Sequence, residues 1–224
     1  MTRTTNARIA GFTFLLYITL GITSMILFGR ATSAEGIAAK LAGIAQHEPA
    51  VRVSAMLNLF TGFTALLLGV TLYAITRDED PDLAMMGLAC RVAEGVVGGV
   101  SIQRSLGLLW LATATGANAP GTETAHALGA FLLGQGWGFM AAATFFAVGS
   151  ALFSWLLLRG RMIPVALAWL GVIASVLLVV GLPLQLVGVL RGLVTQVIWI
   201  QMAAFEVLLA LWLIIKGVAV PATR

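Results

Sequence analysis

Charged side chains are scarce in this sequence, and their scarcity excludes a water-soluble globular protein. Lysine, arginine, aspartate and glutamate make up 10% of the 224 residues, whereas soluble domains carry roughly 25%. Hydrophobic residues make up 60%, and the mean hydropathy is +1.01. A soluble fold has no surface on which to place so much apolar side chain. The composition therefore predicts an all-α integral membrane protein, a polytopic bundle of transmembrane helices.

Cysteine and histidine are also scarce. The single cysteine, Cys90, lies in an apolar segment, which excludes an intrachain disulfide. The two histidines, His47 and His126, have no cysteine or carboxylate cluster beside them, so we predict no metal site. Phosphate loops rich in glycine, nucleophile elbows and HExxH motifs are absent from the sequence. We therefore predict no cofactor.

The isoelectric point is near 10.0, a value that would favour nucleic-acid binding in a soluble protein. Here the basic residues lie mostly at the ends of apolar runs, where they orient a chain in the bilayer. We therefore predict no nucleic-acid partner. Membrane lipids are the expected partners, and a homo-oligomer or a complex with a partner membrane protein are open alternatives.

Six segments have the roughly 20 apolar residues that cross a bilayer as a helix. They cover residues 9–28, 51–75, 83–112, 128–158, 162–189 and 194–216 of a single domain, 1–224. The first segment is longer than the 7–15 apolar residues of a typical secretory signal, so we interpret it as a retained helix. Between the first two spans, Ile37, Leu41 and Ile44 have the spacing of a short amphipathic helix. It is expected to lie on the outer membrane face or to pack back on the bundle.

The distribution of basic residues predicts that both termini are cytoplasmic. With that orientation, the inner side carries seven Lys or Arg residues outside the spans, and the outer side carries four. The inner residues are Arg3, Arg8, Arg77, Arg159, Arg161, Lys216 and Arg224; the outer residues are Arg30, Lys40, Arg52 and Arg191.

The third span carries charged residues within an apolar run. Glu94 follows Arg91 by three residues, so the two side chains can pair on one helix. Arg104 comes thirteen residues after Arg91, roughly 20 Å further along the helix axis. Glu206 lies midway along the last span, where an ionised carboxylate costs on the order of 2.5–3.5 kcal/mol. We therefore expect Glu206 to face protein or water, to pair with Arg91 or Arg104, or to remain protonated.

Other polar and small residues predict which helix faces point inward. On the last span, Gln196, Trp199, Ala203 and Ala210 share the predicted face of Glu206. The ligand-pocket candidates are Arg91, Glu94, Glu206, Asn58, Tyr17, Gln196, Trp199, Gln135 and Arg104. The glycines Gly95 and Gly99, and Gly134 and Gly138, are each four residues apart, a spacing typical of close helix contacts. They predict that the third and fourth spans touch through glycine faces.

Four blocks of the sequence resemble a bacterial family. They are "ARIAG", "LYAITRDEDPDLAMMGLACRVAE", "LLLRGRMIPVALAWLG" and "FEVLLALWLIIKGV". They resemble a six-span membrane family designated a domain of unknown function, number forty-three eighty-six. The resemblance implies a fold and topology and a location in a bacterial inner membrane, and it supplies no activity that could be carried over to this chain. It also implies that Arg91, Glu94 and Glu206 are shared family features.

Three classes of function are compatible with these features. We favour a membrane protein that binds or translocates a small or lipidic ligand in a polar pocket around Arg91, Glu94 and Glu206. The first alternative is an intramembrane enzyme acting on a lipid-like substrate, with Glu94 or Glu206 as general acid or base. The second is an accessory or scaffold subunit in which the ion pairs only hold helices together.

Overall fold

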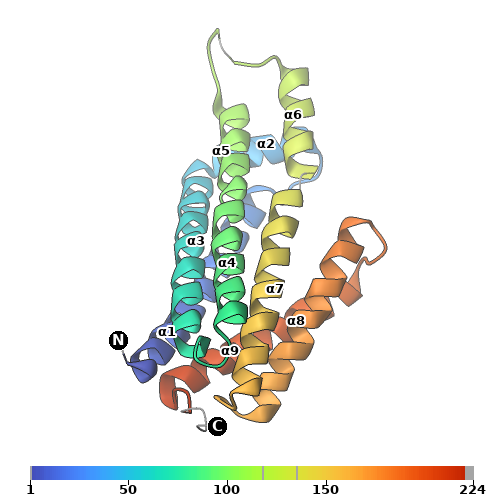
Figure 1. Cartoon of the computed structure of the whole chain (residues 1–224). Coiled ribbons are helices and arrows are strands. Elements are labelled where there is room, and N and C mark those ends of the chain that lie inside the picture. The colour runs from blue at the N-terminus through green and yellow to red at the C-terminus, as the bar shows by residue number, and fades with distance from the viewer. Residues whose placement is uncertain (1, 118, 135, 220–224) are drawn as a thin grey trace.

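The computed structural model describes residues 2–117, 119–134 and 136–219, and this part of the chain is built from helices without strands (Figure 1). The helices are α1 (Arg3–Ala31), α2 (Ile37–Gln46), α3 (Glu48–Thr76), α4 (Pro81–Gly98), α5 (Val100–Thr113), α6 (Thr122–Gly134), α7 (Trp137–Arg159), α8 (Val165–Leu186) and α9 (Leu193–Ile215).

Six spans are long and apolar enough to cross a membrane, which confirms the predicted six-span fold. Four of them are the single helices α1, α3, α8 and α9, and the other two are the pairs α4–α5 and α6–α7. The chain is therefore an integral membrane protein.

Two spans consist of two helices each, a division that the sequence analysis did not predict. Between α4 and α5 only Gly99 intervenes, and its backbone angles are helical, so α5 continues the course of α4. The fourth span, expected as one segment, divides where α6 ends at Gly134 and α7 begins after Gly136. Glycine has a low helix propensity because its backbone loses the most freedom on ordering. The glycine-rich sequence there explains the break.

Two other helix boundaries have local causes in the sequence. The Asp80 side chain accepts a hydrogen bond from the backbone N–H of Leu83 at 3.1 Å, and Pro81 is the first residue of α4. Pro183 lies inside α8, which ends three residues later at Leu186.

The six spans form a closed ring in chain order. α1 packs on α3, α3 on α4, α4 on α7, α7 on α8, and α8 on α9, and α9 then packs back on α1. At the closing contact, the backbone of α1 at Gly11 lies so near α9 that a Cβ built there would be 2.6 Å from the Ala210 carbonyl oxygen. Glycine is required at this position because any side chain would separate the two helices.

One hydrophobic core collects buried residues from all six spans, and a second one lies at the opposite end of the bundle from the start of α1. In the second core, Leu41 and Ile44 of α2 are buried beside Leu108 of α5. Of the two positions expected for this short helix, packing back on the bundle is the one observed. The side of the membrane on which α2 lies stays a prediction.

The other end of the bundle carries the start of α1 and the end of α9 (Figure 1), and charged groups hold it together. Arg159, at the end of α7, pairs with Glu79 at 3.0 Å and with Asp80 at 3.2 Å, both in the connection between α3 and α4. Arg3 donates hydrogen bonds to the Ile75 carbonyl oxygen near the end of α3. These contacts join α1, α3, α4 and α7 at one membrane face.

Candidate functional site

The buried ion pair predicted on the third span is present. Arg91 Nη1 lies 2.9 Å from Glu94 Oε2, and the two side chains are 1% and 7% exposed. Both residues belong to α4, where a separation of three residues places them one turn apart. Arg91 Nη2 also donates to Ser150 Oγ of α7 at 2.9 Å.

Glycines on the neighbouring helices make room for the stem of Arg91. A Cβ built at Gly69 of α3 would lie 2.9 Å from Arg91 Cβ. A Cβ built at Gly149 of α7 would lie 3.7 Å from Arg91 Cγ. The guanidinium carbon sits 4.8 Å from the centre of the Phe146 ring, a cation–π distance. The arginine is therefore enclosed on both sides by backbone that carries no side chain.

Tyr17 and Glu206 bring two further spans to the ion pair. The Tyr17 hydroxyl of α1 donates a 2.6 Å hydrogen bond to Glu94 Oε1. Glu206 of α9 is 5% exposed and close enough to Arg91, Glu94 and Tyr17 for their charges to interact. The buried cluster formed by Tyr17, Arg91, Glu94, Ser150 and Glu206 thus draws on α1, α4, α7 and α9.

We expect Tyr17→Phe to lower the free energy of unfolding by about 1–2 kcal/mol, because it leaves a buried carboxylate oxygen without its donor. Titration of the purified protein with SDS in mild detergent measures this loss. The matched control is Tyr73→Phe, which changes the other tyrosine of the chain. The Tyr73 hydroxyl makes no hydrogen bond within the described residues, so its loss is expected to be near zero. Equal losses in the two variants would contradict the role assigned to Tyr17.

A row of four aromatic rings extends away from this cluster. The Tyr17 ring stacks on Phe146 with the centroids 6.3 Å apart, and Phe146 stacks on Trp199 at 6.2 Å. Trp199 in turn contacts Phe139 with a centroid distance of 5.9 Å. Phe139 lies at the first turn of α7 and borders a pocket, so the rings lead from the buried cluster to that pocket.

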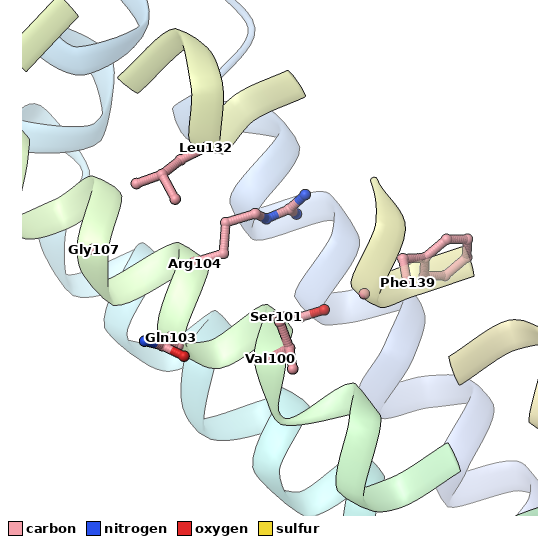
Figure 2. A pocket seen from close by; sticks show the side chains of 8 residues that line it. Val100, Ser101, Gln103, Arg104, Gly107, Leu132 and Phe139 are labelled. Carbon is pink, nitrogen blue, oxygen red and sulfur yellow. The ribbon is translucent and has the colours of Figure 1, made fainter. Parts of the chain in front are cut away.

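The pocket beside Arg104 has a volume of about 400 Å³ and lies between α5, α6 and α7. Its polar residues are Arg104, Ser101 and Gln103 of α5. Its remaining lining residues are Val100, Gly107, Leu132, Gly138 and Phe139. Figure 2 shows the Arg104 side chain extending from α5 toward the space between α6 and α7. The Arg104 guanidinium carbon is 5.7 Å from the centre of the Phe28 ring of α1.

This placement corrects the expectation that Arg104 and Arg91 serve one site. Arg104 borders the pocket, whereas Arg91, Glu94 and Glu206 line none of the three pockets described in the structure. The separation follows from the thirteen residues between the two arginines, which place them on different levels of one span. Of the two arginines expected near Glu206, Arg91 is the one whose charge acts on it.

Two further pocket candidates do not join the buried cluster. Asn58 Oδ1 accepts a 3.0 Å hydrogen bond from Ser24, so it connects α3 with α1. Gln196 is exposed, as is Ala203, and the predicted inward face of α9 was therefore wrong for both. Gln135 lies outside the described residues.

The buried face of α9 is made instead by bulkier residues. They are Met202, Phe205, Glu206, Leu209, Ala210 and Leu213. Gln196 lies in the first turn of the helix, near the end of the span, where a polar amide can reach the membrane surface.

The predicted glycine contact between the third and fourth spans was wrong in its partners. Gly95 of α4 packs on Gly62 of α3, where a Cβ built at Gly95 would be 3.0 Å from the Gly62 carbonyl oxygen. Gly138 contacts Val100 of α5, in agreement with a contact between these two spans. At Gly134, no described neighbour lies within 4 Å of a Cβ. At Gly99, the one described atom within that distance is the Val96 carbonyl oxygen of its own span. These two glycines therefore have no role in helix packing here.

Two residues that contact Arg91 were not predicted from the sequence, namely Ser150 of the buried cluster and Phe146 beside it. A guanidinium has five N–H donors, so a polar partner on a facing helix was to be expected. Which serine supplies it depends on how α7 is rotated against α4. No signal in the sequence distinguishes Ser150 from the other small polar residues of the spans.

A family model described as a domain of unknown function, DUF4386, matches residues 9–217. The match confirms the resemblance inferred from the four sequence blocks. No curated protein and no solved structure matches the chain.

Proposed function

The chain belongs to the DUF4386 family, and we propose that this membrane protein binds a small or lipidic ligand with an anionic group in the pocket beside Arg104. The observation that carries the proposal is a pocket of about 400 Å³ with an arginine in its wall. Pockets that bind small molecules typically measure 300–1,000 Å³ and combine apolar walls with a few polar groups.

The chemistry of the lining favours an amphiphile. A guanidinium such as that of Arg104 carries N–H groups in a planar arrangement that matches the oxygens of a carboxylate or phosphate. Val100, Leu132 and Phe139 supply apolar surface for a hydrocarbon portion. The ligand therefore places its anionic group at Arg104 and its apolar portion against these three side chains.

The helix break in the fourth span adds to the positive character of the pocket. Gly138 and Phe139 belong to the first turn of α7 and line the pocket. N–H groups in the first turn of a helix lack intrahelical acceptors, and the helix dipole there favours negative charge. Both effects act in the same direction as Arg104.

The proposal relocates the ligand from the position expected from the sequence. The buried cluster at Arg91 is instead connected to the pocket wall by the packed aromatic rings of Phe146, Trp199 and Phe139. Glu94 accepts hydrogen bonds at both oxygens, which gives no support to a role as general base. Membrane lipids of a bacterial inner membrane are the proposed source of the ligand.

The test is binding of a fluorescent fatty acid to the purified protein in mild detergent. We expect Arg104→Gln to raise the Kd about tenfold, because it removes the cation and keeps a polar side chain of moderate length; tenfold corresponds to about 1.4 kcal/mol. The matched control is Arg30→Gln, an exposed arginine at the end of α1 that lies outside the pocket lining.

The two variants separate the possible outcomes. A higher Kd in Arg104→Gln alone supports the proposal. The same Kd in the parent and both variants, or the same increase in both variants, would show that the fatty acid partitions without using this pocket. Mass spectrometry of lipids extracted from the parent protein and from Arg104→Gln then identifies the natural ligand class.

A further inference from the structure

We propose that Glu206 is a proton-binding site within the membrane, with its carboxyl group holding a proton while Arg91 is paired with Glu94. The inference goes beyond ligand binding and does not depend on the pocket beside Arg104. It rests on the charges, contacts and burial of the cluster around Arg91.

The cluster contains two carboxyl groups and one cation. Arg91 is committed to Glu94, with the 2.9 Å ion pair between them. Glu94 has a second donor in the Tyr17 hydroxyl at 2.6 Å. Its ionised form is therefore satisfied at both oxygens. The positive charge of Arg91 is offset by the negative charge of Glu94. An ionised Glu206 would therefore add a negative charge that no cation of the cluster compensates.

Glu206 itself has no such partners. Its side chain makes no hydrogen bond or ion pair within the described residues, and its buried Oε1 atom has no donor there. A buried carboxylate without donors is much more costly than a neutral carboxylic acid, so the group takes up a proton. Its depth in the last span increases that cost.

Among the described residues of the helices packed around Glu206, Arg91 is the one cation whose charge acts on it. α1 contributes Tyr17, and α4 contributes Cys90, Arg91 and Glu94. α8, which packs on α9, contains no titratable residue. The other titratable groups in the described parts of α7 and α9 lie at helix ends. Arg159 is the last residue of α7, and Lys216 follows Ile215, the last residue of α9. The arginines of α1 are likewise placed toward its ends, with Arg3 and Arg8 in its first two turns and Arg30 in its last turn.

Proton loss from Glu206 would change the partners of Arg91. Arg91 Nε is buried and has no hydrogen-bond partner within the described residues. An ionised Glu206 would compete with Glu94 for the guanidinium, and the position of α9 relative to α4 would change. The proton on Glu206 thus sets which carboxylate Arg91 binds.

Infrared spectroscopy of the purified protein at neutral pH tests the proposal, because a carboxylic acid has a C=O stretching band that an ionised carboxylate lacks. We expect the parent protein to show this band. Glu206→Gln should abolish it, and Glu206→Asp should shift its frequency. The control Glu35→Gln removes an exposed carboxylate and should leave the band unchanged.

Glu94→Asp identifies which carboxyl group holds the proton. We expect this variant to keep the band at its original frequency. A band that shifts in Glu94→Asp and not in Glu206→Asp would assign the proton to Glu94 and overturn the proposal. Absence of the band in the parent protein would also overturn it. So would failure of Glu206→Gln to fold, because an amide is a neutral group of nearly the same shape.

Discussion

Replacing Arg91 with alanine is expected to lower the free energy of unfolding by about 3–5 kcal/mol, which is the cost typical of removing one partner of a buried ion pair. The change leaves Glu94 buried without its cation and removes the donor to Ser150 and the cation over Phe146. It also leaves a cavity between the glycines of α3 and α7 that enclose the arginine stem. SDS titration in mild detergent measures the loss.

A double variant separates the charge effect from the packing effect. Arg91→Met combined with Glu94→Gln removes both charges and keeps side chains of similar length. We expect it to recover most of the stability lost in Arg91→Ala, since a buried ion pair contributes little beyond a well-packed neutral pair. A double variant as unstable as Arg91→Ala would show that the lost contacts of the guanidinium with Ser150 and Phe146, and not the orphaned carboxylate, cause the loss. Parental stability in Arg91→Ala would contradict the assigned role of the ion pair.

The second large effect is expected at the contact that closes the ring of spans. Gly11→Ala places a Cβ 2.6 Å from the Ala210 carbonyl oxygen and 2.7 Å from Ile214 Cγ1. The first of these atoms is backbone, so α9 must move away from α1. Overpacking of this kind costs typically 1–3 kcal/mol. The same SDS titration is expected to show a loss in this range.

The same helix provides the matched control. At Gly21 of α1, no described neighbour lies within 4 Å of a built Cβ. Gly21→Ala is therefore expected to be neutral or to stabilise the protein by up to about 1 kcal/mol, through the higher helix propensity of alanine. A stability loss of the same size in both variants would mean that glycine is needed for a reason other than the approach of α9.

The sequence was sufficient to predict the spans, because a helix in lipid must satisfy its own backbone and must be apolar over its whole length. It was also sufficient for the Arg91–Glu94 pair, since the two residues are three positions apart on one helix. Asp80 and Pro81 likewise predicted the start of α4 by a local mechanism.

The rotation of each helix was much harder to predict. In a soluble protein, the buried face is the apolar one, but lipid-facing and core-facing residues of a membrane helix are both apolar. The few polar and small residues must then indicate the inward face. On α9 that signal was ambiguous, because Gln196 and Ala203 are exposed while Phe205 and Leu209 are buried.

Contacts between distant helices were beyond prediction for the same reason. The meeting of Arg91 with Ser150, and of Gly62 with Gly95, depends on rotations that a single sequence does not determine. The pocket beside Arg104 depends further on the break between α6 and α7, whose position is set by tertiary packing around a glycine-rich segment.

The ring of spans also imposes an order on biosynthesis. As the chain is translated and inserted, α3, α4, α7 and α8 each meet the preceding span already in the bilayer. α1 differs, because the partner for its Gly11 face is α9, which emerges from the ribosome after the five other spans. Glu206 arrives with that same helix, so the cluster around Arg91 is completed only at the closing step. Until then, the bundle is open between α1 and α8, and the cluster around Arg91 is covered on every side except the one that α9 will occupy.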